Sequence, residues 1–287
     1  MDRKWINSGF EYGDEIVHPI RSAEEFQLRR YFDHIAAGLM NVLDMKFDSP
    51  FSCETEEYIA KTLRNADHAL NRGDIEEAKR LILIPAKLLQ CLLTIREGNE
   101  ALLQEFKNKF HEVEFDRYYG VRCEVETARS LLEHGLEFKH PDPPDFIVTP
   151  HDTELSIECT SIHVETSMDF RQKICDKIGE KNGKYTGGLT TLFIDVTNII
   201  HHSFKQASLV KKQDLKSWIR EDTEIFNWEI GSVLLWSYVY DHKTERYHHA
   251  YIRSDTPNIA DELEQFLDQH YTLDEFEGEE FAYPSQG

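Results

Sequence analysis

The sequence predicts an α/β fold in which helices flank a mixed sheet, with an all-α extension at the N-terminus. Two observations predict it. Residues 22–110 carry apolar positions at helical spacing, whereas short strand-like runs alternate with helical stretches from about residue 111 onward. We therefore expect a helical region over 1–110, a mixed α/β core over 111–253, and an acidic C-terminal helix and tail over 254–287.

The N-terminal helices have recognisable boundaries. Ser22-x-x-Glu25 is a capping-box pattern, and a second helix is expected from about Glu54 to Asn71. The chain then turns at Arg72-Gly73-Asp74 into a helix that begins at Ile75. No second copy of this pair of helices and their turn is visible in the sequence, so an array of helical repeats is not expected. A target-recognition, dimerisation or protein-partner role is expected for this region.

The expected core begins with a helix over Tyr118–His134, which Gly135 ends. Further helical stretches are expected near 169–181 and 206–220. The expected strands are Phe146–Val148, Glu154–Ile162, Leu189–Thr197, Ser232–Tyr240 and Tyr247–Arg253. Helices interleaved with strands in this order predict a mixed sheet.

Composition excludes several classes of protein. The chain has 287 residues, a formal charge of −21 and 40% hydrophobic residues, which is enough apolar material for a core and excludes wholesale disorder. Its five cysteines form no C-x-x-C, which disfavours a disulfide framework or structural zinc. No apolar run approaches the roughly 18 residues of a membrane span, and the start lacks a signal-type apolar region. We expect a cytoplasmic protein without a membrane partner.

The charge is unevenly distributed. Residues 254–287 hold ten acids and no Lys or Arg, whereas 171–220 hold ten basic and four acidic residues, a local +6. Such a segment can contact a phosphate backbone, although a solvated helix face explains the lysines equally well. The lysines expected to contact nucleic acid are Lys181, Lys184, Lys205, Lys211, Lys212 and Lys216.

Three acidic residues are candidates for chemistry, and Glu124 is the first. On a helical wheel at about 100° per residue, Glu124 falls at the rim of the apolar face, whereas Glu126 falls in solvent. Glu124 is therefore expected to point toward the sheet. The alternative is a rim glutamate that pairs with a neighbouring Lys or Arg.

Asp145 and Glu158 are the other two candidates. Asp145 follows Pro143-Pro144 at the point where a strand enters the sheet, although turn aspartates are common at such positions. Glu158 lies in the middle of the apolar run Leu155–Thr160, on the same strand face as Thr160. A carboxylate there is costly to bury unless something compensates its charge, and a divalent cation would do so. The three acids together predict a site for Mg²⁺ or Mn²⁺, which prefer oxygen ligands.

The order of these residues resembles the PD-(D/E)xK nuclease superfamily, over roughly residues 115–253. The order is a helical glutamate, Pro144-Asp145, then Glu158-x-Thr160, followed by a helix with lysines and the strand Phe193-Ile194-Asp195. The resemblance implies a restriction-endonuclease-like fold with Asp145 and Glu158 as metal ligands and Glu124 as a further ligand.

The lysine of the ExK tripeptide does not carry over, because Thr160 stands in its place. A hydroxyl can orient water but cannot supply the positive charge. The resemblance therefore leaves two alternatives. Either Lys173 or Lys177 from the following helix replaces the lysine, or the site is degenerate and binds metal poorly.

Sequence alone thus predicts a metal-dependent nuclease with a role in restriction or defence, whose catalytic residues are Glu124, Asp145, Glu158, Thr160, Lys173 and Lys177. Nucleic acid is the expected partner, with DNA favoured over RNA, and a homodimer would suit cutting of two strands. The alternative is a catalytically degenerate nuclease-fold protein that acts as an acidic binding or immunity-type protein.

Overall fold

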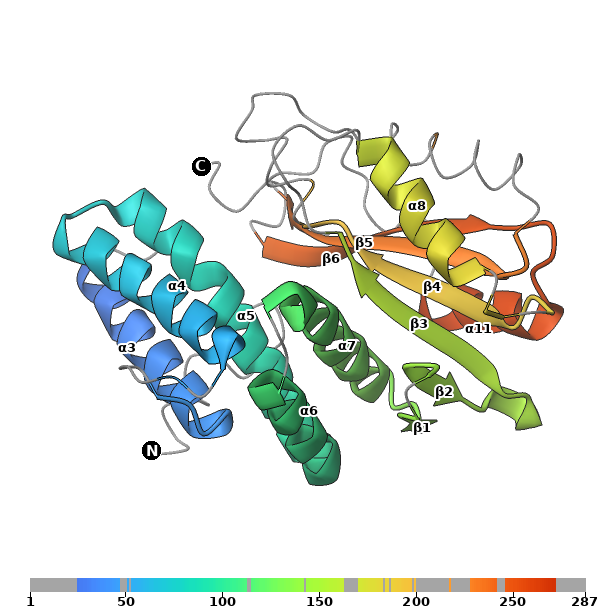
Figure 1. Ribbon diagram of the computed structural model, residues 1–287, viewed down its shortest axis with the longest axis horizontal. Helices are drawn as coiled ribbons and strands as arrows, with labels where there is room; N and C mark the ends of the chain where they lie inside the picture. The colour runs from blue at the N-terminus through green and yellow to red at the C-terminus, as the bar shows by residue number, and fades with distance from the viewer. Residues whose placement is uncertain are drawn as a thin grey trace. The chain divides into compact units, whose positions relative to one another are not determined.

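The computed structural model describes residues 25–46, 51, 53–112, 115–141, 143–162, 170–182, 184–185, 187–197, 199, 217, 228–241 and 246–271 (Figure 1). These residues divide into two compact units. The first takes the described residues of 1–129 and 240–248, and the second takes those of 130–239 and 249–283. The division falls inside a helix, whereas the sequence placed the start of the core at residue 111.

The first unit is mainly helical, and its remaining described residues are the adjoining ends of two strands, in 240–248. Its helices are α3 (Glu25–Val42), α4 (Glu54–Asn71), α5 (Ile75–Gly98), α6 (Glu100–Glu112) and most of α7 (Phe115–Glu133). The expected start and end of α4 are confirmed. Gly73 adopts a φ of +71° in the turn after α4, and the Asp74 carboxylate caps α5 by accepting from the Glu77 N–H at 3.3 Å.

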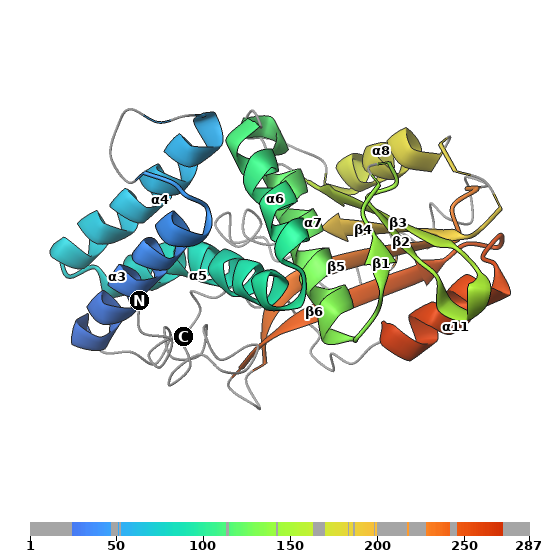
Figure 2. The same ribbon diagram turned by 90° about the horizontal axis from the view of Figure 1, so that it is seen from below.

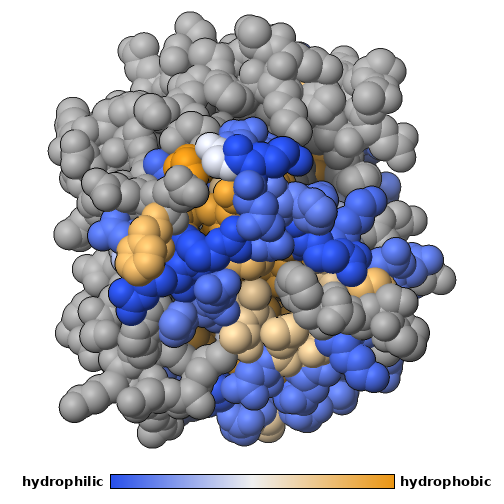
Figure 3. Space-filling view, turned by 90° about the vertical axis from the view of Figure 1, so that its left-hand side faces the viewer, coloured by the Kyte–Doolittle hydropathy of each residue, from blue (hydrophilic) through white to orange (hydrophobic). Residues whose placement is uncertain are grey.

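Buried apolar residues of α3, α4 and α5 form the core of this unit, among them Leu28, Leu63 and Ile82. The left-hand side of Figure 1, seen in Figure 3, carries a broad hydrophilic band with separate apolar patches. Among the described residues, Phe26 of α3 is the only large hydrophobic residue that is exposed. Scattered apolar residues of this kind are ordinary on a protein surface.

The second unit is built on a six-stranded mixed sheet in the order β1-β2-β3-β4-β5-β6. The strands are β1 (Phe138–Lys139), β2 (Phe146–Val148), β3 (Leu155–Ser161), β4 (Thr190–Asp195), β5 (Ser232–Asp241) and β6 (Arg246–Asp255). β1, β2 and β3 pair antiparallel, whereas β3, β4 and β5 pair parallel. The expected mixed α/β fold with N-terminal helices is therefore confirmed.

Helices cover both faces of this sheet (Figure 2). On one face, Ile174 and Ile178 of α8 (Phe170–Asn182) pack in a buried cluster with Leu192 and Ile194 of β4. On the other face, the Phe193 ring lies 5.1 Å from that of Tyr271, which follows α11 (Asp261–His270). Because parallel partners point the same way, the pairing Glu158↔Leu192 puts Glu158 on the α8 face.

Other expectations fall partly outside the described residues. Trp228 and Trp236 are buried, and none of the five cysteines forms a disulfide. The acidic C-terminal segment begins with α11, but the tail beyond residue 271 and the helix expected near 206–220 are outside the described ranges. In the residues that the structure describes, no helix has the length and apolar character needed to cross a membrane.

Candidate functional site: a buried carboxylate pair beside Lys181

Glu158 is almost completely buried in the middle of β3, at 2% exposure. Its charge is compensated by two side chains from the end of α8 and the turn that follows. The Lys181 Nζ atom lies 2.5 Å from Glu158 Oε2, and the Tyr185 hydroxyl donates to Oε1. The sequence expectation that a mid-strand glutamate needs a compensating charge is met here by an ammonium group of the protein itself.

Asp145 is held against the same stretch of β3. The pairing Phe146↔Ile157 places Asp145, one residue before β2, opposite Glu158 in the antiparallel register. Residues that face each other in this way project from the same side of a sheet. The Asp145 Oδ2 atom accepts from the Cys159 N–H at 2.6 Å, and Asp145 is 8% exposed. The structure therefore brings Asp145 and Glu158 together on the α8 face.

Lys181 is the lysine that reaches these carboxylates. Burial lowers the pKa of Lys181, but the hydrogen bond and charge of Glu158, with the charge of Asp145, raise it more, so the pKa lies above its usual value. The ammonium form is therefore favoured. Lys181 lies in the last turn of α8, where the negative end of the helix dipole also favours a cation. The sequence had assigned Lys181 to the backbone contacts rather than to the site.

Lys173 and Lys177, which sequence reasoning put forward for this role, belong to earlier turns of α8. Lys177 Nζ lies 2.7 Å from Glu180 Oε2 at the surface. Ile174, Ile178 and Lys181 share one helix face, because their spacing of four and three residues returns to the same side. This spacing is the sequence signal that could have selected Lys181. Gln172, a neighbour of these lysines, bonds to Asp176.

The segment that follows α8 is fixed to the neighbouring loops. Asn182 Oδ1 accepts from the Glu229 N–H at 2.6 Å, and the Gly188 carbonyl accepts from the Ala260 N–H at 3.1 Å. A Cβ on Gly188 would lie 1.7 Å from the Asn258 carbonyl oxygen, so only glycine fits there. These bonds join Asn182 and Gly188, which lie on either side of Tyr185 in the chain, to the neighbouring loops. Tyr185 could not be selected from the sequence. It follows the end of α8, where helical spacing no longer indicates which way a side chain points.

Thr160 stands two residues after Glu158 on the same face and is half-buried, opposite Ile194 in the register. Asp195 lies on the other face, because its partner is Ser161, and its Oδ1 accepts from the Thr197 N–H at 2.8 Å. Thr160 thus shares the side of the carboxylate pair, whereas Asp195 does not.

Glu124 and Glu126 correct the helical-wheel expectation. Glu126 was expected in solvent but is 3% exposed, with its Oε1 3.8 Å from Arg122 Nε. From Val121 to Leu131, every residue of α7 except Glu124 is buried, so a helix with one solvent face is the wrong description. Glu124 Oε2 lies 2.6 Å from Lys109 Nζ within the first unit. This ion pair agrees with the alternative expectation, in which a glutamate at the rim of the apolar face pairs with a neighbouring Lys or Arg.

The expected nucleic-acid contacts are only partly described. Lys184 is exposed in the turn after α8. Lys205, Lys211, Lys212 and Lys216 lie outside the described residues. The structure therefore assigns no surface to most of this set.

The donor set suits a hard cation. Carboxylate oxygens are the ligands that Mg²⁺ and Mn²⁺ prefer, and Mg²⁺ commonly uses one or two protein carboxylates while keeping several waters. Asp145 and Glu158 supply such a pair. Within the described ranges there is no group of three or more His, Cys, Asp and Glu side chains that could hold a metal ion.

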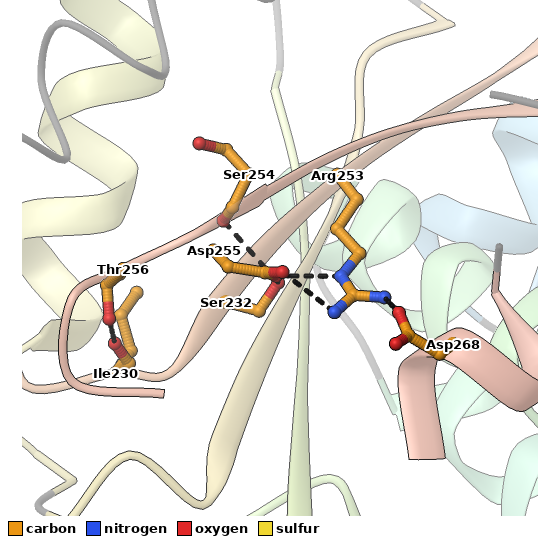
Figure 4. A network of polar contacts seen from close by, with 7 residues as sticks. All are labelled: Ile230, Ser232, Arg253, Ser254, Asp255, Thr256 and Asp268. Atoms are coloured by element: carbon orange, nitrogen blue, oxygen red, sulfur yellow. Dashed lines mark hydrogen bonds and ion pairs between the residues drawn. The ribbon is translucent and has the colours of Figure 1, made fainter. Parts of the chain in front are cut away.

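A second buried polar network joins β6 to α11 (Figure 4). The Arg253 side chain, at 1% exposure, donates through Nε and Nη2 to the two carboxylate oxygens of Asp255, each at 2.7 Å, and through Nη1 to Asp268 at 2.6 Å. Ser232 Oγ donates to Asp255 Oδ1 at 2.8 Å. Because every charge in it has a partner, we assign this network to the stability of the second unit.

Comparison with protein-family models, curated proteins and solved structures finds no match to this chain.

Proposed function

We propose that the second unit contains a metal-dependent, nuclease-like site that hydrolyses phosphodiester bonds. The observation that carries the proposal is the placement of two buried carboxylates, Asp145 just before β2 and Glu158 in β3, at facing positions, with the Lys181 ammonium bonded to one of them. Two carboxylates can hold a divalent ion, and such an ion can activate water and stabilise charge on a phosphoryl oxygen.

Each residue has a role in this proposal. Asp145 and Glu158 would hold Mg²⁺ or Mn²⁺, which supplies an activated water and neutralises charge on a phosphoryl oxygen when bound. Lys181 would supply a positive charge to an oxygen of the scissile phosphate. Thr160, on the same face, is suited to orient water through its hydroxyl. The burial of both acids excludes bulk water and strengthens these interactions.

The resemblance stated above gains support from Lys181. The ExK lysine is missing because Thr160 occupies its place, and α8 brings a lysine to the same glutamate from 23 residues away. The charge that a tripeptide lysine would supply is therefore present beside Glu158. The helix–strand order on which the resemblance rests is also the order of α7, β2, β3, α8 and β4.

The substrate is proposed to be nucleic acid, because the 171–220 segment is the only markedly basic part of a sequence whose net charge is −21. Within this proposal, DNA is favoured over RNA. Lys184, Lys205, Lys211, Lys212 and Lys216 would contact its backbone. A cytoplasmic location and a homodimer complete the proposal, since twofold symmetry would present one site to each strand.

A cleavage assay with matched variants tests this proposal. The purified protein is expected to cleave DNA in Mg²⁺ or Mn²⁺, with RNA compared in parallel, and Asp145→Asn and Glu158→Gln are expected to abolish cleavage. Glu154→Gln is the control, because Glu154 immediately precedes β3 but forms a surface pair with Lys139, at 3.1 Å. Wild-type cleavage by both site variants, with melting curves that show them folded, would overturn the proposal.

One observation favours a second candidate function, that of an acidic binding or immunity-type protein. Both oxygens of Glu158 already accept from protein groups, so its charge is compensated without a metal. A net charge of −21 suits a basic partner. This function predicts no cleavage, no heat on titration with Mn²⁺, and salt-sensitive binding to polylysine. Cleavage lost in Glu158→Gln would exclude it.

A further inference from the structure

The two oxygens of Glu158 are held by donors of different character. Oε2 is bonded to the Lys181 ammonium and Oε1 to the neutral Tyr185 hydroxyl. We propose that Lys181 occupies the cation position of the site and competes with the metal for Glu158, so that it must leave Glu158 for the metal to bind. This inference rests on the proposed function.

Competition follows from charge. A divalent cation and an ammonium group that share one buried carboxylate repel each other strongly, because burial reduces the screening between them. Glu158 has one negative charge and is almost fully buried, so it cannot balance three positive charges. The Asp145 carboxylate adds one negative charge nearby but is itself bonded to the backbone of β3.

The structure also gives Lys181 a way to leave. Its side chain is 22% exposed, whereas that of Glu158 is 3% exposed, so the Lys181 side chain is the partner of this contact that borders solvent. A lysine has a flexible four-carbon stem and can turn from a carboxylate to another anion. A substrate phosphate is such an anion, and Lys181 would then contact phosphate only after the metal has taken its place on Glu158.

Tyr185 is a positioning residue in this scheme. Its hydroxyl is neutral, so it need not leave when a cation arrives, and it can keep the Glu158 carboxylate oriented throughout. Loss of the Tyr185 hydroxyl should therefore change metal affinity far less than loss of the Lys181 charge.

Calorimetric titration with Mn²⁺ in the absence of nucleic acid tests the competition. Lys181→Gln is expected to bind Mn²⁺ at least about tenfold more tightly than the wild type, because the competing charge is gone. Lys181→Arg keeps the charge and is expected to show no such gain. Lys177→Gln is the matched control on α8, since Lys177 pairs with Glu180 at the surface. Glu158→Gln is expected to lose binding.

Equal or weaker Mn²⁺ binding by a folded Lys181→Gln overturns the competition, and so does an absence of heat from both proteins. Thermal melts establish that each variant is folded. Failure here is distinguishable from failure of the nuclease proposal, because the cleavage assay with Glu158→Gln decides that proposal independently. A protein that cleaves through Glu158 but shows no gain in Lys181→Gln disproves the competition alone.

Discussion

The Lys181 ammonium lies 2.5 Å from Glu158 Oε2, although the two residues are 23 positions apart in the chain. The contact joins α8 to the buried centre of β3, and Asp145 faces the same glutamate from the start of β2. Glu158 belongs to β3, Lys181 to α8, and Asp145 immediately precedes β2 in the second unit. A set of acids and one cation assembled in this way can serve chemistry, and the following predictions test that use and the fold that supports it.

Lys181→Gln is expected to reduce the cleavage rate about a hundredfold, because one donor to the developing phosphate charge is lost. The same variant is expected to bind Mn²⁺ more tightly, so the two effects have opposite signs. Single-turnover cleavage of a labelled duplex measures the rate. Lys177→Gln should cleave at the wild-type rate, and an equal loss in both variants would contradict the assignment of Lys181.

Gly188→Ala is expected to destabilise the protein by more than about 3 kcal/mol, because its Cβ would collide with the backbone at Asn258. Gly187→Ala is the matched control. Gly187 also has a positive φ, of +85°, but among the described residues no atom beyond its chain neighbours lies within 4 Å of the added Cβ, so the cost is limited to about 1–2 kcal/mol of backbone strain. Urea unfolding compares the two free energies. Equal losses would show that the close approach to Asn258 does not exist.

Arg253→Met is expected to cost about 3 kcal/mol in the free energy of unfolding, because it leaves the Asp255 carboxylate without its bidentate partner. Asp268→Asn should cost less than about 1 kcal/mol, since the Asp268 side chain is mostly exposed. Denaturant unfolding of the two variants measures this difference. A smaller loss in Arg253→Met than in Asp268→Asn would disprove the stability role of the network.

Stability is expected to fall with pH below neutrality, in part through His270. Burial lowers the pKa of His270, and the charge of His134, whose ring centroid lies 5.3 Å away, lowers it further. The unfolded chain therefore takes up a proton at higher pH than the folded protein does. Stability is present above the unfolded value of about 6.5 and is lost as the pH falls from there through the folded pKa.

Melting temperatures between pH 7.5 and 5 measure this effect. His270→Gln is expected to melt with a weaker dependence on pH than the wild type over this interval, because its contribution to proton uptake is removed. An unchanged slope in the variant would show that His270 does not contribute. His134→Gln should reduce the slope as well, since it removes the neighbouring charge.

Much of the fold could be predicted because the strands are short apolar runs between clear turns. The expected bounds of β2 agree with the structure, and those of β3 and β4 lie within two residues. β1 was missed because the two residues Phe138 and Lys139 are too few to show a period. The burial of Glu126 was missed because a helical wheel assumes one solvent face, and α7 has none along 121–131.

The candidate site was predictable in part for the same reasons. A glutamate inside an apolar strand is conspicuous, so Glu158 could be selected, and the Pro144-Asp145 turn could be placed beside it. The sequence did not identify the lysine that bonds to Glu158. The choice among Lys173, Lys177 and Lys181 depends on where the end of α8 lies over β3. The face shared by Ile174, Ile178 and Lys181 contains that information in part.

A crystal of the protein grown with Mn²⁺ gives the most direct test of the central claim, which is that Asp145 and Glu158 form a cation site served by Lys181. The anomalous difference map is expected to show a peak about 2.2 Å from an oxygen of each carboxylate, with the Lys181 ammonium moved away from Glu158. A map with no peak there, and with Lys181 still bonded to Glu158 at saturating Mn²⁺, would contradict the account.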